Sequence, residues 1–385
     1  MRDSKAAVQA FRVCVSDAAL EDLKTRLRAT RWPNKETVSD WSQGMPLAYL
    51  RDLVDYWANR YAWRAREARL NEFAQCRVLV GGLNIHAYHV RSAHSQAVPL
   101  LMTHGWPGSV VEFLKVLGPL TAPERYGGDP RDAFHVVCPS LPGYGFSDAA
   151  RDPGCGVEKI AQLWDELMAA LGYATYFAQG GDWGASVTTQ IALQNRGRCR
   201  GIHLNMPIAA PTPEEIANPT AADSKAFAAR AHYAKFEAGY STQQSTRPQT
   251  LGYGLVDSPA AQCAWIIEKF WAWTDCDGNP ENAIARDELL DNVMLYWLPG
   301  AGASSARLYW ESFRNSFGRE LPKVTLPTGC SIFAKELSQP PRAWVERRYT
   351  KLVYWNELPK GGHFAAFEQP ELFVREIRDC FGRMR

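Results

Sequence analysis

The sequence has no run of about 18 consecutive apolar residues, which is the length that a membrane-spanning helix needs. Its opening, MRDSKAAVQAFRV, contains no apolar core long enough for a secretory signal peptide. No basic cluster stands out, and 43 Lys and Arg against 41 Asp and Glu leave a net charge of +2. We therefore expect no membrane span, no nucleic-acid partner and no binding to an anionic membrane.

Closely spaced cysteines are missing as well. No two of the nine cysteines form a CxxC pair; they are Cys14, Cys76, Cys138, Cys155, Cys199, Cys263, Cys276, Cys330 and Cys380. A zinc site or a disulfide framework is therefore not expected. Scattered thiols are typical of small buried residues in a reducing compartment, so we predict a cytoplasmic protein without a structural metal.

The first part of the chain has helical patterns. Ser16 precedes a run in which leucines recur at steps of three and four, which predicts an amphipathic helix capped by its serine. Pro46 begins a second such run that extends to Tyr61. We interpret residues 1–75 as an N-terminal helical region.

From residue 76 the pattern alternates between strands and helices. Apolar runs typical of strands cover Cys76–Val80, Leu83–Tyr88, Val98–Thr103, Phe134–Cys138, Tyr176–Gln179, Ile202–Asn205, Cys330–Ala334 and Lys351–Trp355. This alternation predicts an α/β protein with a mostly parallel sheet covered on both faces. Residues 207–318 are instead aromatic-rich and helix-like. They predict a lid inserted between two parts of the core, residues 76–206 and 319–385.

The central motif is GGDWG at residues 180–184, between a predicted strand and a predicted helix. α/β-Hydrolases carry their nucleophile on such a tight turn, where small residues two before and two after it let the chain fold back. The usual Ser position holds Asp182, and no GxSxG motif competes elsewhere in the chain. The alternative is an ordinary glycine-rich turn with an exposed aspartate.

An aspartate nucleophile implies a particular chemistry. A carboxylate needs no base to activate it, and it can displace a leaving group at an sp³ carbon to form an alkyl ester. That ester must then be hydrolysed by an activated water molecule. An epoxide would give a diol by this route, and a haloalkane would give an alcohol.

A second motif, HGWP at residues 104–107, directly follows the predicted strand Val98–Thr103. In this fold the loop after that strand supplies one N–H of the oxyanion hole, and the residue after the nucleophile supplies the other. These positions are Trp106 and Trp183. Taken alone, HGWP could equally be a structural turn.

The third motif is GGHF at residues 361–364. The order nucleophile, acid, histidine is the one this fold uses, and it makes His363 the candidate base. Glu336 follows a predicted strand at the height where an acid could orient the imidazole. Glu320 and Glu346 are competitors for that role, more typical of solvated surface charges.

Together these segments resemble the microsomal-type epoxide hydrolases. Six segments carry the resemblance, which extends from about Phe11 to the C-terminus: FRVCVSDAALEDLKTRLRATRWP, HGWPGSVVEF, PSLPGYGFSD, AQGGDWGASV, NVMLYW and GGHFAAFEQPEL. The resemblance implies an α/β-hydrolase fold with a helical lid, and an N-terminal segment that wraps the core. It also implies hydrolysis of a small-molecule epoxide by water, without a cofactor or metal.

The same resemblance implies the roles of individual residues. Asp182 would be the nucleophile, His363 the base and Glu336 its acid. Two lid tyrosines hold the epoxide oxygen in the family, and the matching positions are Tyr240 in AGYSTQQ and Tyr309 in RLYWES. Tyrosines 233 and 253 are neighbouring alternatives to the first of these.

The sequence departs from the family in two places. The membrane anchor of the mammalian members has no counterpart, and the segment FAK before Glu336 lacks the proline that many relatives carry. Similar proteins often dimerise, so a homodimer is a further expectation of the resemblance. Two other functions stay open: a haloalkane or haloacid dehalogenase with the same nucleophile, and a non-catalytic hydrolase-like binding protein.

Overall fold

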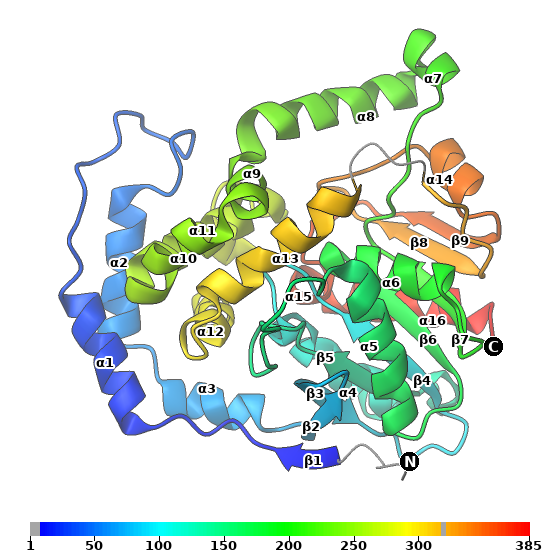
Figure 1. The fold of residues 1–385 in the computed structure, drawn as a ribbon, viewed down its shortest axis with the longest axis horizontal. Helices are drawn as coiled ribbons and strands as arrows, with labels where there is room; N and C mark the ends of the chain where they lie inside the picture. The colour runs from blue at the N-terminus through cyan, green and yellow to red at the C-terminus, as the bar shows by residue number, and fades with distance from the viewer. Residues whose placement is uncertain (1–7, 317–320) are drawn as a thin grey trace.

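The computed structural model describes residues 8–316 and 321–385, with the side chains of 314–316 left aside, and is built around one sheet (Figure 1). In the described residues this sheet has nine strands in the order β1-β2-β3-β5-β4-β6-β7-β8-β9. They are β1 (Val8–Phe11), β2 (Gln75–Val80), β3 (Leu83–Val90), β4 (Val98–Thr103), β5 (Phe134–Pro139), β6 (Tyr176–Gly180), β7 (Cys199–Leu204), β8 (Thr328–Ile332) and β9 (Leu352–Glu357).

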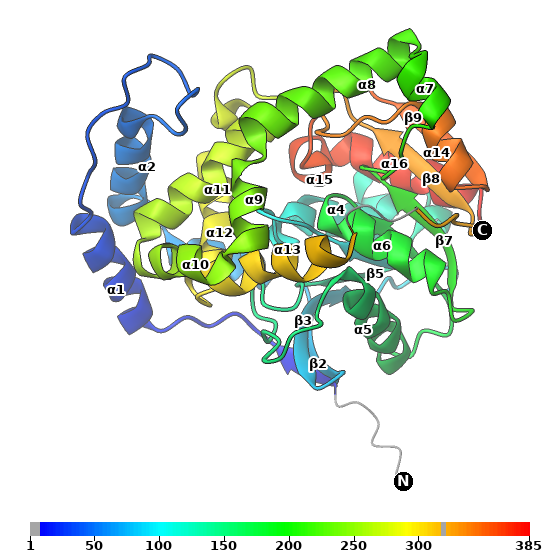
Figure 2. The same ribbon diagram turned by 45° about the horizontal axis from the view of Figure 1, so that its top comes forward.

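The sheet is mostly parallel, as predicted. From β5 to β9 every neighbouring pair is parallel, whereas β1, β2 and β3 join it in antiparallel pairs. Figures 1 and 2 show α5 (Val157–Ala170) and α6 (Trp183–Leu193) on one face, and α4 (Leu114–Thr121) and α16 (Pro370–Gly382) on the other. Because helices cover both faces, the central strands are buried and their sequences are continuous apolar runs.

Strand ends differ from the prediction by a few residues. The strand predicted at Cys330–Ala334 lies at Thr328–Ile332, and the one predicted at Ile202–Asn205 begins at Cys199. Apolar side chains continue past the end of β8, because Phe333 is fully buried in the loop that follows. A hydrophobic pattern reports burial, so it does not show where hydrogen bonding between strands stops.

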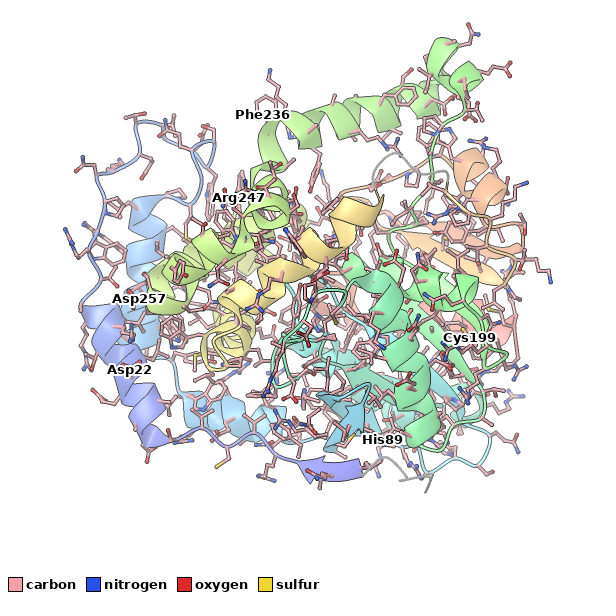
Figure 3. All side chains as sticks on the ribbon, viewed as in Figure 1. Asp22, His89, Cys199, Phe236, Arg247 and Asp257 are labelled. Carbon is pink, nitrogen blue, oxygen red and sulfur yellow. The ribbon has the colours of Figure 1, made fainter. Side chains whose placement is uncertain are left out.

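Between β7 and β8 the described chain is entirely helical and irregular. Its helices are α7 (Pro213–Ala217), α8 (Ala221–His232), a π-helical turn (Tyr233–Glu237), α9 (Gly239–Thr246), α10 (Pro248–Asp257), α11 (Pro259–Trp273), α12 (Arg286–Trp297) and α13 (Gly302–Ser316). The bend between α8 and α9 carries Phe236, labelled in Figure 3, whose side chain is 63% exposed. The predicted lid boundary at 318 and 319 lies outside the described residues.

The N-terminal region forms α1 (Asp17–Arg28), α2 (Leu47–Asn59) and α3 (Trp63–Leu70). The predicted cap of α1 is confirmed, since the Ser16 side chain accepts from the backbone N–H of Ala19. The pattern indicated neither α3 nor β1. Four residues are too few for a periodic signal, and β1 exists because the edge of β2 offers it hydrogen-bonding partners.

The N-terminal helices lie against the inserted helices. Arg26 on α1 pairs with Asp257 at the end of α10, at 2.9 Å, and Figure 3 labels this aspartate close to Asp22 of α1. Deeper in, the Tyr61 hydroxyl donates to Asp291 of α12 at 2.7 Å, and Arg66 pairs with the same carboxylate. Residues 61–66 therefore hold α12 in place.

The remaining helices are short. They include α14 (Arg342–Arg348) and α15 (Ala365–Glu368), together with four 3₁₀ turns at Val110–Phe113, Pro123–Tyr126, Pro130–Asp132 and Pro280–Asn282. Across residues 8–316 and 321–385, no helix combines the length and hydropathy needed to cross a bilayer.

Candidate active site

Asp182 lies at the turn between β6 and α6, in a strained backbone conformation. Its φ of 51° and ψ of −128° are uncommon for a residue with a side chain. The flanking glycines are required by space. A Cβ at Gly180 would lie 2.1 Å from the carbonyl oxygen of Gly184, and one at Gly184 would lie 1.9 Å from that of Thr103. The turn therefore presents Asp182 at the carboxyl end of the central strand.

The loop after β4 brings a backbone donor to this carboxylate. The N–H of Trp106 donates to Asp182 Oδ1 at 2.9 Å. Gly105 makes the approach possible, because a Cβ there would lie 2.1 Å from the same oxygen. Trp183 is the first residue of α6, so its N–H has no partner within the helix and belongs to the free helix N-terminus.

His363 bridges two carboxylates. Its Nε2 lies 3.2 Å from Asp182 Oδ2, and its Nδ1 lies 2.6 Å from Glu336 Oε1. Both His363 and Glu336 are buried, at 6% and 5% exposed. The structure thus brings together three residues that are 181 and 27 positions apart in the chain.

The competing glutamates do not share this position. Glu346 is an exposed residue of α14 that pairs with Arg342 at 2.7 Å. Glu320 lies outside the described residues. Glu336 reaches the histidine because the N–H of Lys335 donates to the carbonyl oxygen of Gly361 at 2.9 Å, which ties the two loops together.

The charges around His363 determine its protonation. Burial lowers the pKa of the imidazole, but Glu336 and Asp182 outweigh this effect and raise it well above the usual value. The imidazolium is therefore stabilised while both carboxylates carry their charge. Loss of the Asp182 charge would remove part of that stabilisation.

The two predicted tyrosines face Asp182 from the inserted helices. The ring of Tyr240 stacks on Trp106 at 4.8 Å between centroids, and Tyr309 meets Tyr240 edge to face at 5.7 Å. Tyr309 also packs against Trp183 at 4.8 Å. Burial raises the pKa of both phenols well above 10, and Asp182 raises it further, so both hydroxyls keep their protons and remain donors.

The alternative tyrosines behave differently from each other. Tyr253 is 68% exposed on α10 and lies outside the aromatic cluster that Trp106, Tyr240 and Tyr309 form. Tyr233, at the start of the π-helical turn, places its hydroxyl 3.0 Å from that of Tyr240. Tyr233 is therefore a neighbour that orients Tyr240, and Tyr240 is the residue in contact with Trp106.

Two residues of α12 support the loop that carries Trp106, and sequence reasoning assigned them no role. Asn292 Nδ2 donates to the carbonyl oxygen of Pro107 at 2.7 Å, and the Tyr296 hydroxyl donates to that of Gly108 at 2.6 Å. Both side chains are almost completely buried. The available signal was the segment NVMLYW, in which these two residues stand four positions apart and so share one face of the helix.

Glu368 is a third supporting residue that the sequence did not reveal. Its carboxylate accepts from the N–H groups of Gly362 and Phe364, both at 3.0 Å, and from Asp275 at 2.8 Å. The N–H of His363 itself donates to the carbonyl oxygen of Trp273 at 2.9 Å. The histidine loop is thereby fixed to the segment that follows α11.

The two histidines of β3 have structural partners. His86 contacts Ser140 and Gln75 through its two ring nitrogens, both at 2.9 Å. His89 contacts the Tyr173 hydroxyl at 2.8 Å, and Figure 3 shows it at the side of the sheet far from the inserted helices. In the part of the chain that the structure describes, no group of three His, Cys, Asp or Glu residues is arranged to hold a metal ion.

Comparison with known proteins gives concordant results. The family model described as "Epoxide hydrolase N terminus" matches residues 8–113, and that of the "alpha/beta hydrolase fold" matches residues 98–253. A Stigmatella aurantiaca protein named "Putative epoxide hydrolase" is 52% identical over 97% of this chain and 85% of its own length. "Epoxide hydrolase 1" of Sus scrofa is 35% identical, over 98% of this chain and 89% of its own.

A solved structure agrees with these relatives. The juvenile hormone epoxide hydrolase of the silkworm Bombyx mori superposes with a TM-score of 0.90 at 33% identity, over 99% of this chain and 95% of that one. Relatives above 30% identity thus cover nearly the whole chain, in sequence and in structure. The chain belongs to the epoxide hydrolase family, hydrolases of ether bonds with the α/β-hydrolase fold.

Proposed function

We propose that this protein converts an epoxide to a vicinal diol through a covalent ester on Asp182. The observation that carries the proposal is that His363 contacts the Asp182 carboxylate, while Tyr240 and Tyr309 of the inserted helices pack on Trp106 and Trp183 beside it. No cofactor or metal enters the reaction, and the substrates are a small-molecule epoxide and water.

In the first step Asp182 attacks one epoxide carbon. The hydroxyls of Tyr240 and Tyr309 hold the epoxide oxygen and stabilise the alkoxide that forms as the ring opens. Because burial raises their pKa values, both groups carry their protons at neutral pH and each can donate a hydrogen bond. One of the tyrosine hydroxyls passes its proton to this alkoxide and regains a proton from solvent. The product is an alkyl ester of Asp182 with a neighbouring hydroxyl group.

In the second step water attacks the carbonyl carbon of that ester, and His363 Nε2 takes the proton. Esterification removes the Asp182 charge that helps to raise the pKa of His363, so the imidazole becomes a base when a base is needed. Glu336 continues to orient the ring through Nδ1. The N–H of Trp106, with that of Trp183, stabilises the oxyanion.

The dehalogenase alternative shares Asp182 and His363, but it has no use for two phenol donors. The aromatic cluster of Trp106, Tyr240 and Tyr309 therefore favours an epoxide over a haloalkane or haloacid. The binding-protein alternative would not need the strained backbone at Asp182, which costs stability. A cytoplasmic location and a homodimer stay predictions of the sequence.

We also propose the division predicted from the sequence. Residues 1–75 form the N-terminal helical region that wraps the core, residues 76–206 and 319–385 form the hydrolase core, and residues 207–318 form the lid. The position of α7 to α13 between β7 and β8 supports this division, as does the contact of the N-terminal helices with α12.

The test uses mass spectrometry of the peptide that contains Asp182 after many turnovers of an aryl epoxide in ¹⁸O-water. We expect diol formation and ¹⁸O in the Asp182 carboxylate, because water attacks the ester carbonyl. Diol without label would mean direct attack by water and would overturn the ester mechanism. Alcohol from haloalkanes, with no diol from any epoxide, would establish the dehalogenase alternative instead.

A further inference from the structure

A small cavity lies beside Asp182, on the side of the core. Its volume is about 20 Å³, and all the described residues that line it lie outside the lid segment 207–318. Its walls include Glu112, Gln179, Asn205 and His363. About 10–15 Å³ of this kind of volume holds one water molecule, so the cavity has room for a single water and none for an organic substrate.

Gln179 gives this cavity an acceptor. It lies at the end of β6 with its side chain 1% exposed, and its Nε2 donates to Asn205 Oδ1 at 2.6 Å. Asn205 Nδ2 in turn donates to the carbonyl oxygen of Ser331 at 3.5 Å, which fixes the orientation of both amides. Gln179 Oε1 is then left buried without a protein donor. A buried acceptor of this kind is stabilised by a donor, and a water molecule in the adjoining cavity supplies one.

Glu112 gives the cavity a second polar wall. Its side chain is buried, and burial raises the pKa of the carboxyl to about 8. It therefore keeps its proton at neutral pH and can both donate and accept. His104, another lining residue, is not available, because its Nδ1 is bonded to the Gly105 carbonyl oxygen and its Nε2 accepts from Leu141.

We infer that this cavity binds the water molecule that hydrolyses the alkyl ester, with Gln179 Oε1 and the Glu112 carboxyl as its hydrogen-bond partners. The inference rests on the proposed function. The tyrosines hold the alcohol part of the ester on the lid side of Asp182, so water stored on the core side is not displaced by substrate. The two reactants then reach the same carboxyl group from different directions.

The step that this water undergoes is ordinary ester hydrolysis. Its oxygen bonds to Cγ of Asp182, and one of its protons moves to His363 Nε2. The bond between Cγ and the alkyl oxygen then breaks, and the departing alkoxide takes the proton from His363. The second proton of the water passes from the new carboxyl group to His363, so the enzyme ends with one new oxygen in an Asp182 carboxylate beside the imidazolium.

The experiment separates the two steps by single-turnover kinetics, with quenched samples analysed for covalent ester by mass spectrometry. In Gln179→Met, which keeps the volume and removes the acceptor, alkylation should stay within about two-fold of the unsubstituted protein. Ester hydrolysis should slow roughly ten-fold or more, as expected for loss of one hydrogen bond to the reacting water, so ester accumulates. A merely structural defect would slow both steps.

Gln262→Met is the matched control. Gln262 on α11 is also a buried glutamine with an unpartnered Oε1, and it does not line the cavity. It should leave the ratio of the two rate constants unchanged. A second variant, Ala366→Val, fills the cavity from its wall and should also slow hydrolysis selectively.

Two outcomes would overturn the inference. One is hydrolysis at the original rate in Gln179→Met, and the other is a parallel loss of alkylation and hydrolysis in that variant. A high-resolution crystal structure provides an independent check, and it should show a water within hydrogen-bond distance of Gln179 Oε1. If the unsubstituted protein forms no ester, the proposed function itself fails. An ester that forms and decays equally fast in Gln179→Met overturns only the water site.

Discussion

Asn292 on lid helix α12 donates a hydrogen bond to the carbonyl oxygen of Pro107 in the loop after β4, 2.7 Å away and 185 residues apart in the chain. This contact holds the loop in the position from which the Trp106 N–H donates to Asp182. Asp291, the residue before it, is held by Tyr61 and Arg66 of the N-terminal region. The N-terminal segment thus supports the active site through α12, without touching Asp182.

Removing this support should reduce activity. Asn292→Ala leaves the Pro107 carbonyl buried without its donor, at a cost of about 1–3 kcal/mol, so we expect kcat/KM to fall roughly ten-fold or more. Tyr296→Phe should act in the same direction through Gly108. Steady-state kinetics on an aryl epoxide measures both effects. Asn59→Ala, at the exposed end of α2, is the control. If kcat/KM fell equally in Asn59→Ala and Asn292→Ala, Asn292 would have no specific role in supporting the loop after β4.

The pKa of His363 should depend on the charge of Asp182. Burial lowers this pKa, whereas Glu336 and Asp182 raise it well above the usual value. Asp182→Asn removes one of the two charges and imitates the neutral ester, so the pKa should fall. NMR titration of the imidazole nitrogens measures it directly. An unchanged pKa in Asp182→Asn would mean that Asp182 does not control the base, and that the proposed switch between the steps is absent.

The lid tyrosines should act on alkylation. Tyr309→Phe removes a donor to the developing alkoxide, and loss of such a donor typically costs about 10²–10³ in rate. Tyr240→Phe should act likewise, and the double variant should nearly stop ester formation. Single-turnover alkylation rates provide the measurement. Tyr253→Phe, an exposed position on the same lid, should match the unsubstituted protein. Rapid ester formation in the double variant would refute the role of the phenols.

The buried carboxyl of Glu112 should make stability depend on pH. Burial raises its pKa from 4.5 to about 8; Asp182 and Glu368 also raise it, and His363 lowers it. Since the folded pKa exceeds the unfolded one, this group's contribution to stability is present below about pH 4.5. It is lost by about pH 8, with a slope of up to about 1.4 kcal/mol per pH unit.

Glu112→Gln lacks this proton, so its free energy of unfolding should improve relative to the unsubstituted protein as the pH rises. Urea unfolding at about pH 5 and about pH 8 tests the sign. Gln262→Met changes no ionisable group, so it should change the free energy of unfolding by the same amount at both pH values. The stability difference between Glu112→Gln and the unsubstituted protein could instead be the same at both pH values. That result would show that the Glu112 carboxyl titrates with its ordinary pKa in the folded protein.

The sequence by itself determined the architecture and the central chemistry of this protein. Continuous apolar runs separated by helical patterns predicted the mostly parallel sheet, because hydrophobic periodicity directly reflects burial. The motif GGDWG predicted the turn at Asp182, since a backbone that folds back so closely admits only glycine at 180 and 184. Both are local properties that neighbouring residues encode.

Only the tertiary structure decided which distant groups meet. Glu336 was distinguished from Glu346 by its 2.6 Å contact with His363, and Tyr240 from Tyr253 by burial against Trp106. The roles of Asn292 and Glu368 were not predicted, because each depends on a carbonyl or N–H group whose position is set by a different part of the fold. A hydrogen bond between residues far apart in the chain leaves no periodicity in the sequence, so only the folded structure shows it.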